Sequence, residues 1–188
     1  MPRVVSGSAK GFTLKSVKGL KTRPTADKVK ESIFNIIAFN VAGSKFLDLY
    51  SGTGQMGIEA LSRGGQFAAF VDNDRESLKC IKDNLEKTKL ESKSKVLAMN
   101  VLSAITSLNG IWKFDIVYID PPYESAIGSF KKIARAFYEN DSLEPKAIVL
   151  LEHSANDKPD ENVINLKLKK SCKYGAVMVS FYDKEQID

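Results

Sequence analysis

The sequence contains few of the residues that build metal centres and disulfide frameworks. Its 188 residues include two cysteines, Cys80 and Cys172, and a single histidine, His153. Two distant cysteines outside any CxxC pattern argue against a disulfide scaffold or a cysteine metal site, and they favour a reducing cytosol. One histidine supplies too few ligands for a histidine-based metal centre, so we expect no metal.

Long apolar runs are also missing. No stretch approaches the roughly 20 apolar residues that a membrane-spanning helix needs. The first residues, Met-Pro-Arg, lack the apolar core of a signal peptide, so we expect a cytoplasmic location. Hydrophobic residues make up 43% of the chain, which is typical of a soluble globular protein.

Acidic residues are scarce at the start of the chain. The net charge is +5, but residues 1–30 contain eight Lys or Arg and one acid, Asp27, so the other 158 positions sum to −2. A basic arm on a near-neutral body suits a polyanion, because phosphate contacts supply most of the non-specific affinity for nucleic acid. The alternative is a solvated tail that aids solubility.

Residues 1–43 are predicted to form an N-terminal extension distinct from the body that follows. In it, Arg3–Val5 and Phe12–Leu14 flank a turn and predict a small β-hairpin. A helix is expected to follow, from a cap at Thr25 or Asp27 through Phe39.

Residues 44–188 form the body, where strand and helix patterns alternate. The predicted strands are Lys45–Leu49, Gln66–Asp72, Lys95–Asn100, Phe114–Ile119, Ala147–Glu152, Val163–Lys170 and Ala176–Tyr182. The predicted helices are Met56–Arg63, Arg75–Leu90, Ser103–Leu108 and Ser125–Tyr138. This alternation predicts an α/β fold with a mostly parallel doubly wound sheet, and the last two strands, with no helix between them, predict an antiparallel hairpin at its edge.

A glycine-rich turn joins the first strand and helix of the body. It reads Asp48-Leu49-Tyr50-Ser51-Gly52-Thr53-Gly54-Gln55-Met56-Gly57. Such a turn lets a ligand approach the backbone and meets it with the NH groups of a helix N-terminus. The next strand ends at Asp72, where an acid can accept hydrogen bonds from ribose hydroxyls, with Asp74 as the alternative.

Three interpretations of this turn remain open: a tight turn with no ligand, a NAD site and an S-adenosylmethionine site. Gly52, Gly54 and Gly57 match the dinucleotide pattern G-x-G-x-x-G, which is a weak signal alone. S-adenosylmethionine carries an ammonium and a sulfonium but no pyrophosphate. The acid Asp48, just before the turn, therefore favours S-adenosylmethionine.

A second motif follows the fourth strand directly and reads Asp120-Pro121-Pro122-Tyr123. Ligands of open parallel sheets bind beyond the carboxyl ends of the strands, which is where this motif is expected. The prolines stiffen the turn, so the Pro121 carbonyl and the Asp120 carboxylate can accept the two hydrogens of an exocyclic amino group. Tyr123 offers a flat face on which a base can stack. The motif predicts an amino-methyltransferase that needs no metal or strong base, because positioning and electrostatics suffice.

These motifs together resemble the RsmD-type methyltransferases, which make N2-methylguanine at one position of bacterial small-subunit ribosomal RNA. The resemblance lies in the segment RPTADKVKESIFN at Arg23–Asn35, in the glycine turn and in Asp120-Pro121-Pro122-Tyr123, and it extends to Gly7, Gly11, Tyr174-Gly175 and Ser180-Phe181-Tyr182. It implies a Rossmann-like seven-stranded fold, S-adenosylmethionine as methyl donor, a cytoplasmic location and a basic N-terminal segment that contacts ribosomal RNA.

Charge and resemblance together give two sets of binding residues. The cofactor set comprises Asp48, Tyr50, Ser51, Gly52, Thr53, Gly54, Gly57, Asp72, Asn73, Asn100 and Val101. The RNA set comprises Arg3, Lys10, Lys15, Lys21, Arg23, Thr25 and Lys28. Asn100 stands where the resemblance implies an acid for the adenine amino group, and an asparagine oxygen can accept the same bond.

Other functions stay open from the sequence. DNA adenine-N6 enzymes also use Asp-Pro-Pro-Tyr, but they usually need a target-recognition domain for which this chain has no room. An NAD-linked oxidoreductase would lack an acid–base pair, since only His153 is available. A catalytically silent RNA-binding assembly factor would not need the intact Asp120. The substrate is expected to be ribosomal RNA, free or within a small subunit, and the protein a monomer.

Overall fold

The computed structural model describes residues 1–17, 27–122 and 126–185. These residues form two units, Met1–Met99 and Asn100–Asp188, which are described in turn.

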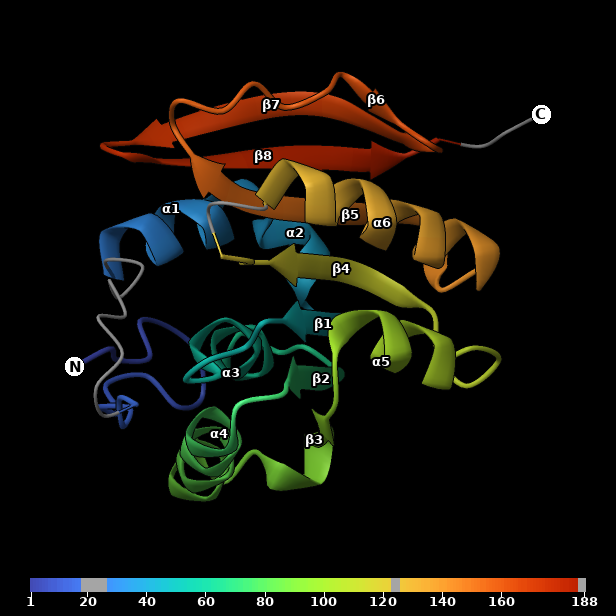
Figure 1. Ribbon diagram of the computed structural model, residues 1–188. Helices are drawn as coiled ribbons and strands as arrows, with labels where there is room; N and C mark the ends of the chain where they lie inside the picture. Colours follow the sequence, from blue (N-terminus) through green and yellow to red (C-terminus); the bar gives the residue numbers. More distant parts are fainter. Residues whose placement is uncertain (18–26, 123–125, 186–188) are drawn as a thin grey trace. The chain divides into compact units, whose positions relative to one another are not determined.

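Three parallel strands form the sheet of the first unit. They are β1 (Lys45–Leu49), β2 (Phe67–Asp72) and β3 (Ser94–Ala98), in the order β3-β2-β1. In the register of the first pair, Asp48 lies opposite Phe70. The helices α3 (Gln55–Ser62) and α4 (Arg75–Thr88) connect them, with a short 3-10 turn, η1 (Glu91–Lys93), before β3 (Figure 1). This confirms the strand–helix alternation predicted for the start of the body.

Both connecting helices begin and pack for identifiable reasons. Asp74 caps α4, because its carboxylate accepts a hydrogen bond from the Ser77 NH at 2.7 Å. Ile81 and Leu85 face the core from the same helix and are buried. Gly57 lets α3 lie close to β2, since a Cβ at this position would come within 2.4 Å of the Phe70 ring.

The N-terminal part of the first unit contains two helices, α1 (Asp27–Ile36) and α2 (Ala38–Val41). The predicted helix through Phe39 is therefore interrupted at Ile37. Residues 1–17, called the N-terminal segment below, fold back on themselves through one antiparallel bridge between Arg3 and Thr13. The predicted hairpin is confirmed, but it is held by one bridge rather than by two regular strands.

The second unit contains two helices and five strands in the part of the chain that the structure describes. The helices are α5 (Val101–Ser107) and α6 (Ala126–Glu139). The strands are β4 (Phe114–Ile119), β5 (Leu143–Ser154), β6 (Asn162–Val163), β7 (Leu166–Tyr174) and β8 (Val177–Lys184), in the order β4-β5-β8-β7-β6. β4 pairs with β5 in parallel, and the remaining pairs are antiparallel (Figure 1).

The antiparallel end of the second unit confirms the predicted C-terminal hairpin. One strand was not predicted: the two-residue β6 adds to the seven expected strands, because the chain before β7 turns back and pairs with it. The Phe130 ring of α6 packs against Tyr182 of β8 with centroids 4.7 Å apart. His153 is fully buried on β5, and its Nε2 lies 2.8 Å from the Ser180 hydroxyl of β8, so it has a structural role.

Among the described residues, no helix combines the length and the apolar character required to cross a bilayer.

Candidate cofactor site and catalytic motif

The glycine turn of the first unit has an unusual backbone. Tyr50, Gly52 and Gly54 all have positive φ angles, of 59°, 54° and 75°. Glycine adopts such angles without the steric cost that other residues incur. The Gly54 NH donates to the Ser51 carbonyl at 2.7 Å, which closes the turn just before α3. The predicted glycine positions are thus required by the shape of the turn.

Ser51 fixes the turn to the neighbouring strand. Its hydroxyl donates to the Asp48 carbonyl at 2.6 Å and accepts from the Val71 NH at 2.9 Å. Its own NH donates to the Val71 carbonyl at 3.0 Å. Ser51 therefore continues the hydrogen bonding between β1 and β2 past the end of β1, through its own NH and its hydroxyl.

Asp72 is the acid that contacts the turn. One oxygen of its carboxylate accepts the Gly52 NH at 2.8 Å, and the other accepts the Asp74 NH at 2.9 Å. Asp74 is committed to capping α4, and the cap lowers the pKa of Asp74 through the hydrogen bond from Ser77. Of the two predicted candidates, Asp72 is therefore the one placed to meet a ligand of the turn.

Asp48 is a buried carboxylate at the base of the turn. It is 2% exposed, and its Oδ2 accepts the Gly57 NH at 2.9 Å. Burial raises the pKa of Asp48 to about 8, the Gly57 hydrogen bond opposes this rise, and the charge of Asp72 adds to it. The carboxyl is therefore largely protonated near neutral pH, and a bound cation would favour its ionised form.

This raised pKa predicts a pH dependence of cofactor binding. The affinity of S-adenosylhomocysteine, which carries an ammonium, should rise between pH 6 and pH 8 by at most about tenfold per pH unit and then level off, because ionised Asp48 attracts the cation. Calorimetric titration at several pH values checks this. The free energy of unfolding should change in the opposite direction. Because folding raises the pKa of Asp48, this residue contributes stability that is fully present below the unfolded pKa near 4 and is lost as the pH rises through about 8.

The control for this prediction is Asp48→Asn, which keeps an acceptor for the Gly57 NH but cannot ionise. In this variant the pH dependence that remains belongs to the ligand itself. If the wild type and Asp48→Asn give parallel pH profiles, Asp48 does not face the ligand's cation.

Gly57, a predicted member of the cofactor set, has a structural role in the turn. Its NH is bonded to Asp48, and its missing side chain makes room for Phe70. It therefore supports the turn through the packing of helix on strand, as the third glycine of such patterns does.

Two predicted cofactor residues belong to the second unit. The strand β3 ends at Ala98, two residues earlier than expected, and Asn100 is the N-cap of α5. Its side-chain oxygen accepts the Ser103 NH at 2.9 Å, and its amide donates to the Ser103 hydroxyl at 2.9 Å. Val101 is buried in the first turn of this helix. A carbonyl oxygen has two lone pairs, so the cap leaves one with which Asn100 can accept an adenine amino group.

The predicted catalytic motif directly follows β4 in the second unit. Its first residue, Asp120, is half-buried, Pro121 is buried and Pro122 is exposed. Tyr123 lies outside the described residues. In the β4–β5 register Ile119 lies opposite Leu151, so the motif begins where these two parallel strands end together.

A buried acid that the sequence analysis did not single out lies at the same strand ends. Glu152 follows Leu151 on β5 and is 4% exposed. Its carboxylate accepts a hydrogen bond from the hydroxyl of Tyr118, which is two residues before Asp120 on β4. This pair ties the last residues of β4 to β5. A glutamate directly after the apolar run Ala147–Leu151 was the available signal.

The basic residues of the extension differ in how they are placed. Arg3, Lys10, Lys15 and Lys28 are exposed in the first unit. Two of them contact acids: Arg3 lies 3.1 Å from Asp27, and Lys15 lies 2.8 Å from Asp83. The other predicted RNA contacts, Lys21, Arg23 and Thr25, lie outside the described residues. Lys30, which adds to the basic character of the sequence, is fully buried and is a structural residue.

The residues of the first unit fit an adenosine with a cationic amino-acid tail. Gly52 has no side chain, and its NH donates to the carboxylate of Asp72. The buried carboxyl of Asp48 accepts the NH of Gly57 in the first turn of α3. An acid at the end of β2 suits ribose hydroxyls, and Asp48 suits an ammonium. The turn, as observed, therefore meets the chemical demands of S-adenosylmethionine.

Comparison of the whole chain with solved structures defines the class of protein. The Escherichia coli protein yhhF, described as a "Putative methyltransferase", superposes with a TM-score of 0.83 and 28% sequence identity, over 98% of both chains. The fold is that of the S-adenosylmethionine-dependent methyltransferases, and the chain is a methyltransferase.

Sequence comparison then gives the family. The family model described as "Conserved hypothetical protein 95" matches residues 2–183. The Bacillus subtilis "Putative rRNA methyltransferase YlbH" is 37% identical over 97% of this chain and 98% of its own. "Ribosomal RNA small subunit methyltransferase D" of Haemophilus influenzae is 30% identical over 96% of this chain and 92% of its own. The chain belongs to this family of RsmD-type methyltransferases.

Proposed function

We propose that this protein transfers a methyl group from S-adenosylmethionine to the exocyclic N2 of a guanine in small-subunit ribosomal RNA. The observation that carries the proposal is the Asp120-Pro121-Pro122 turn at the end of the buried strand β4, in a chain of the RsmD-type family. The names of the relatives, which refer to ribosomal RNA, support the substrate class.

The protein's own contribution to the chemistry is to hold the amino group. The Asp120 carboxylate accepts one N2 hydrogen and the Pro121 carbonyl accepts the other, which directs the nitrogen lone pair toward the methyl group. Since prolines have no NH and fix φ, the turn keeps these two acceptors in place. Tyr123 stacks on the guanine, which leaves its helix at a cost of roughly a few kcal/mol.

The donor is held by the turn after β1. Its sulfonium supplies an activated methyl group, so the protein needs neither a metal nor a strong base. Asp72 binds the ribose hydroxyls, Asp48 faces the cationic tail, and Asn100 accepts the adenine amino group. Rate acceleration then comes from orientation and from electrostatics fixed in advance.

Residues 1–43 serve as the RNA-binding extension and residues 44–188 as the catalytic domain in this proposal. The exposed basic residues of the extension contact phosphates, which position the RNA without reading its sequence. The protein acts in the cytoplasm as a monomer, on ribosomal RNA that is free or within a small subunit.

The test is to map methylated nucleotides in ribosomal RNA from cells that lack the gene. One N2-methylguanine of the small-subunit RNA should disappear, and it should return when the wild-type gene, but not Asp120→Ala, is supplied. Genomic DNA of the same cells is mapped in parallel, and loss of an N6-methyladenine from the DNA instead would support the adenine-N6 alternative. An unchanged set of methylated nucleotides would overturn the enzymatic proposal and favour an assembly factor.

The exposed lysines predict a salt dependence of RNA binding. Replacing Lys10 and Lys28 together by alanine should weaken binding and reduce the slope of log K against log salt by about 0.7–0.9 for each phosphate that is no longer neutralised. Affinity for a ribosomal RNA fragment, measured at several salt concentrations, checks this. S-adenosylhomocysteine binding should be unchanged.

The matched control replaces Lys93 and Lys95, two exposed lysines at η1 and β3, by alanine. This change lowers the net charge equally. If both double variants reduce the slope by the same amount, the effect is one of overall charge and the extension has no specific part in RNA binding.

A further inference from the structure

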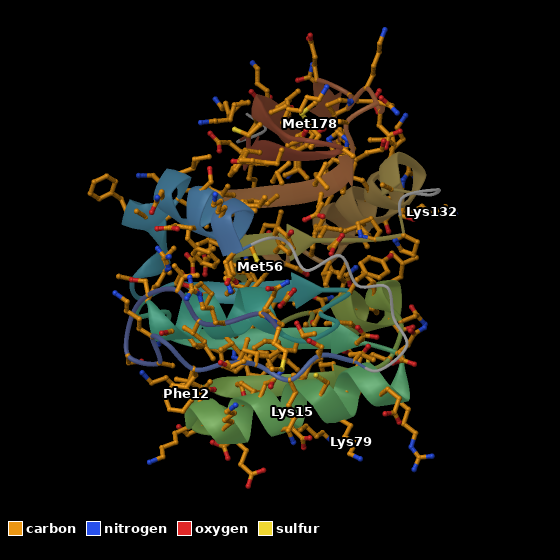
Figure 2. All side chains as sticks on the ribbon, turned by 90° about the vertical axis from the view of Figure 1, so that its left-hand side faces the viewer. Phe12, Lys15, Met56, Lys79, Lys132 and Met178 are labelled. Carbon is orange, nitrogen blue, oxygen red and sulfur yellow. The ribbon has the colours of Figure 1, made fainter. Side chains whose placement is uncertain are left out.

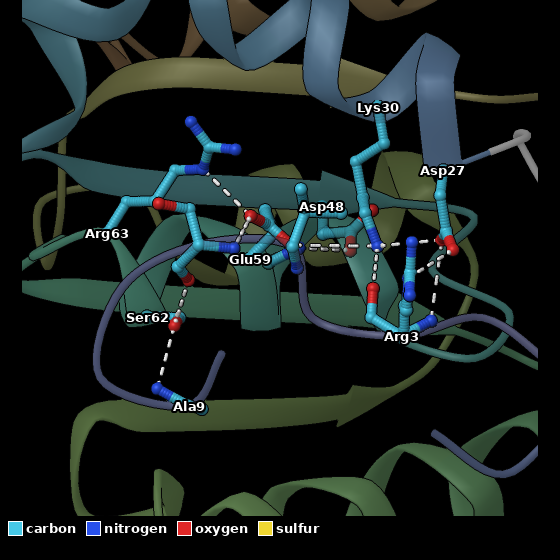
Figure 3. Close-up of polar contacts among 11 residues, drawn as sticks. Arg3, Ala9, Asp27, Lys30, Asp48, Glu59, Ser62 and Arg63 are labelled. Carbon is cyan, nitrogen blue, oxygen red and sulfur yellow. Dashed lines mark hydrogen bonds and ion pairs between the residues drawn. The ribbon is translucent and has the colours of Figure 1, made fainter. Parts of the chain in front are cut away.

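The N-terminal segment is held on the first unit by buried side chains of α3 and α4. Glu59 of α3 accepts the NH groups of Val5 and Ser6 at 2.8 and 3.0 Å. The Ser62 hydroxyl accepts the Ala9 NH at 3.0 Å (Figure 3). These bonds reach the main chain of the segment, so its path does not depend on its own charged side chains.

Asn84 of α4 holds the far end of the same segment. Its side-chain oxygen accepts the Lys15 NH at 2.7 Å, and its amide nitrogen lies 3.2 Å from the Lys15 carbonyl. Asn84 is fully buried. The Lys15 side chain, labelled in Figure 2, is 60% exposed and pairs with Asp83. Lys15 therefore has a fixed main chain and an exposed charge.

The same amide also reaches the glycine turn. The Asn84 amide nitrogen donates to the Thr53 carbonyl at 2.9 Å. Thr53 follows Gly52, whose NH is bonded to Asp72. Two peptide groups of the turn, the one before Gly52 and the one after Thr53, are thus set by side chains from outside it: Asp72 bonds the first and Asn84 the second.

We propose that Asn84 is a positioning residue that couples the cofactor turn to the N-terminal segment, so that S-adenosylmethionine and RNA each tighten the binding of the other. The assignment of the two ligands rests on the proposed function. The coupling itself rests on one buried amide that bonds Thr53 on one side and Lys15 on the other. A ligand that orders Thr53 also orders Lys15 through Asn84, and the reverse holds. The second ligand then loses less conformational entropy when it binds.

The first test uses the wild-type protein and no RNA. Addition of S-adenosylhomocysteine should slow hydrogen exchange of the Lys15 amide at least about fivefold. This factor corresponds to the lower end of the usual range of coupling free energies between two sites. The Val4 and Gly11 amides, which bond only within the segment at 2.9 Å each, serve as internal controls and should change less. Equal protection of all three, or of none, overturns the coupling.

The second test measures linkage by calorimetry with a ribosomal RNA fragment. In the wild type, RNA should tighten S-adenosylhomocysteine binding about fivefold or more, and the cofactor should tighten RNA binding by the same factor, as linkage requires. Asn84→Asp keeps the acceptor for the Lys15 NH and loses the donors to the Thr53 and Lys15 carbonyls. It should bind cofactor more weakly and reduce the linkage factor toward one.

The matched control is Lys15→Ala, which removes the exposed charge and keeps both main-chain bonds to Asn84. It should lower RNA affinity and leave the linkage factor unchanged. Linkage that survives Asn84→Asp overturns the proposal. If no variant, including the wild type, binds ribosomal RNA, the proposed substrate is wrong, and the exchange experiment still decides whether the turn and the segment are coupled.

Discussion

Replacing Asp120 by alanine should lower the rate of methyl transfer by about 10²–10³-fold or more, the loss seen when one fixed electrostatic partner of a reacting group is removed. The variant removes one of the two acceptors that hold the amino group. The Pro121 carbonyl alone leaves that group free to rotate, so its lone pair no longer points at the methyl group. Single-turnover transfer of labelled methyl to ribosomal RNA measures the effect.

Cofactor binding should separate this effect from a folding defect. In the proposed mechanism Asp120 holds the amino group of the guanine and is not one of the predicted cofactor residues. The affinity for S-adenosylhomocysteine should therefore change little in Asp120→Ala. Asp120→Asn provides a graded control, because its side chain keeps one neutral acceptor, and its rate should fall between those of the wild type and the alanine variant. Unchanged turnover in Asp120→Ala would refute the catalytic role.

The arrangement of strands followed from features that are local in the sequence. β4 was predicted with its observed bounds, because a largely apolar run ends at an acid and two prolines, and prolines lack the NH that a strand needs for pairing. The glycine turn was predicted for a similar reason: positive φ angles and the close approach of α3 to Phe70 both demand glycine. Such requirements are visible without any knowledge of distant partners.

The buried polar residues could not be predicted in the same way, because their partners are far away in the sequence. Asn84 lies between Ile81 and Leu85 on α4, and only the fold reveals that it meets Lys15, 69 residues earlier. Lys30 looked like part of a basic arm, yet it is buried against Glu59. Charge in a sequence predicts exposure on average, so a buried ion pair is the case that such a prediction misses.

Glu59 is the residue whose loss should destabilise the first unit most. Its carboxylate is fully buried and accepts the Arg63 Nε–H at 2.8 Å as well as the two NH groups of the N-terminal segment. It also lies 3.6 Å from the Lys30 ammonium, and neither side chain is exposed (Figure 3). Without Glu59 the buried Lys30 ammonium keeps, among the described residues, only the half-buried Asp27, 3.7 Å away, as a charged partner. Removing one partner of a buried pair is strongly destabilising, so Glu59→Ala should lower the free energy of unfolding by about 3–5 kcal/mol.

The pH dependence of this loss follows from Lys30. Burial lowers the pKa of Lys30, and the charges of Glu59 and Asp27 oppose that decrease. Without Glu59 the pKa of Lys30 should fall further. A lysine pKa lowered on folding means that the unfolded chain binds more protons, so the stability of Glu59→Ala should rise with pH up to the unfolded value near 10.5. Urea unfolding between pH 7 and pH 10 measures this.

A double variant isolates the charge from the hydrogen bonds. Lys30→Met removes the buried ammonium and keeps most of the side-chain volume, so it should restore part of the stability lost in Glu59→Ala and remove its rise with pH. The stability that is not restored is the contribution of the hydrogen bonds that Val5, Ser6 and Arg63 donate to Glu59 in the wild type. If Lys30→Met and Glu59→Ala are simply additive, the two side chains do not interact. Glu59 would then stabilise the unit only by holding the N-terminal segment on α3.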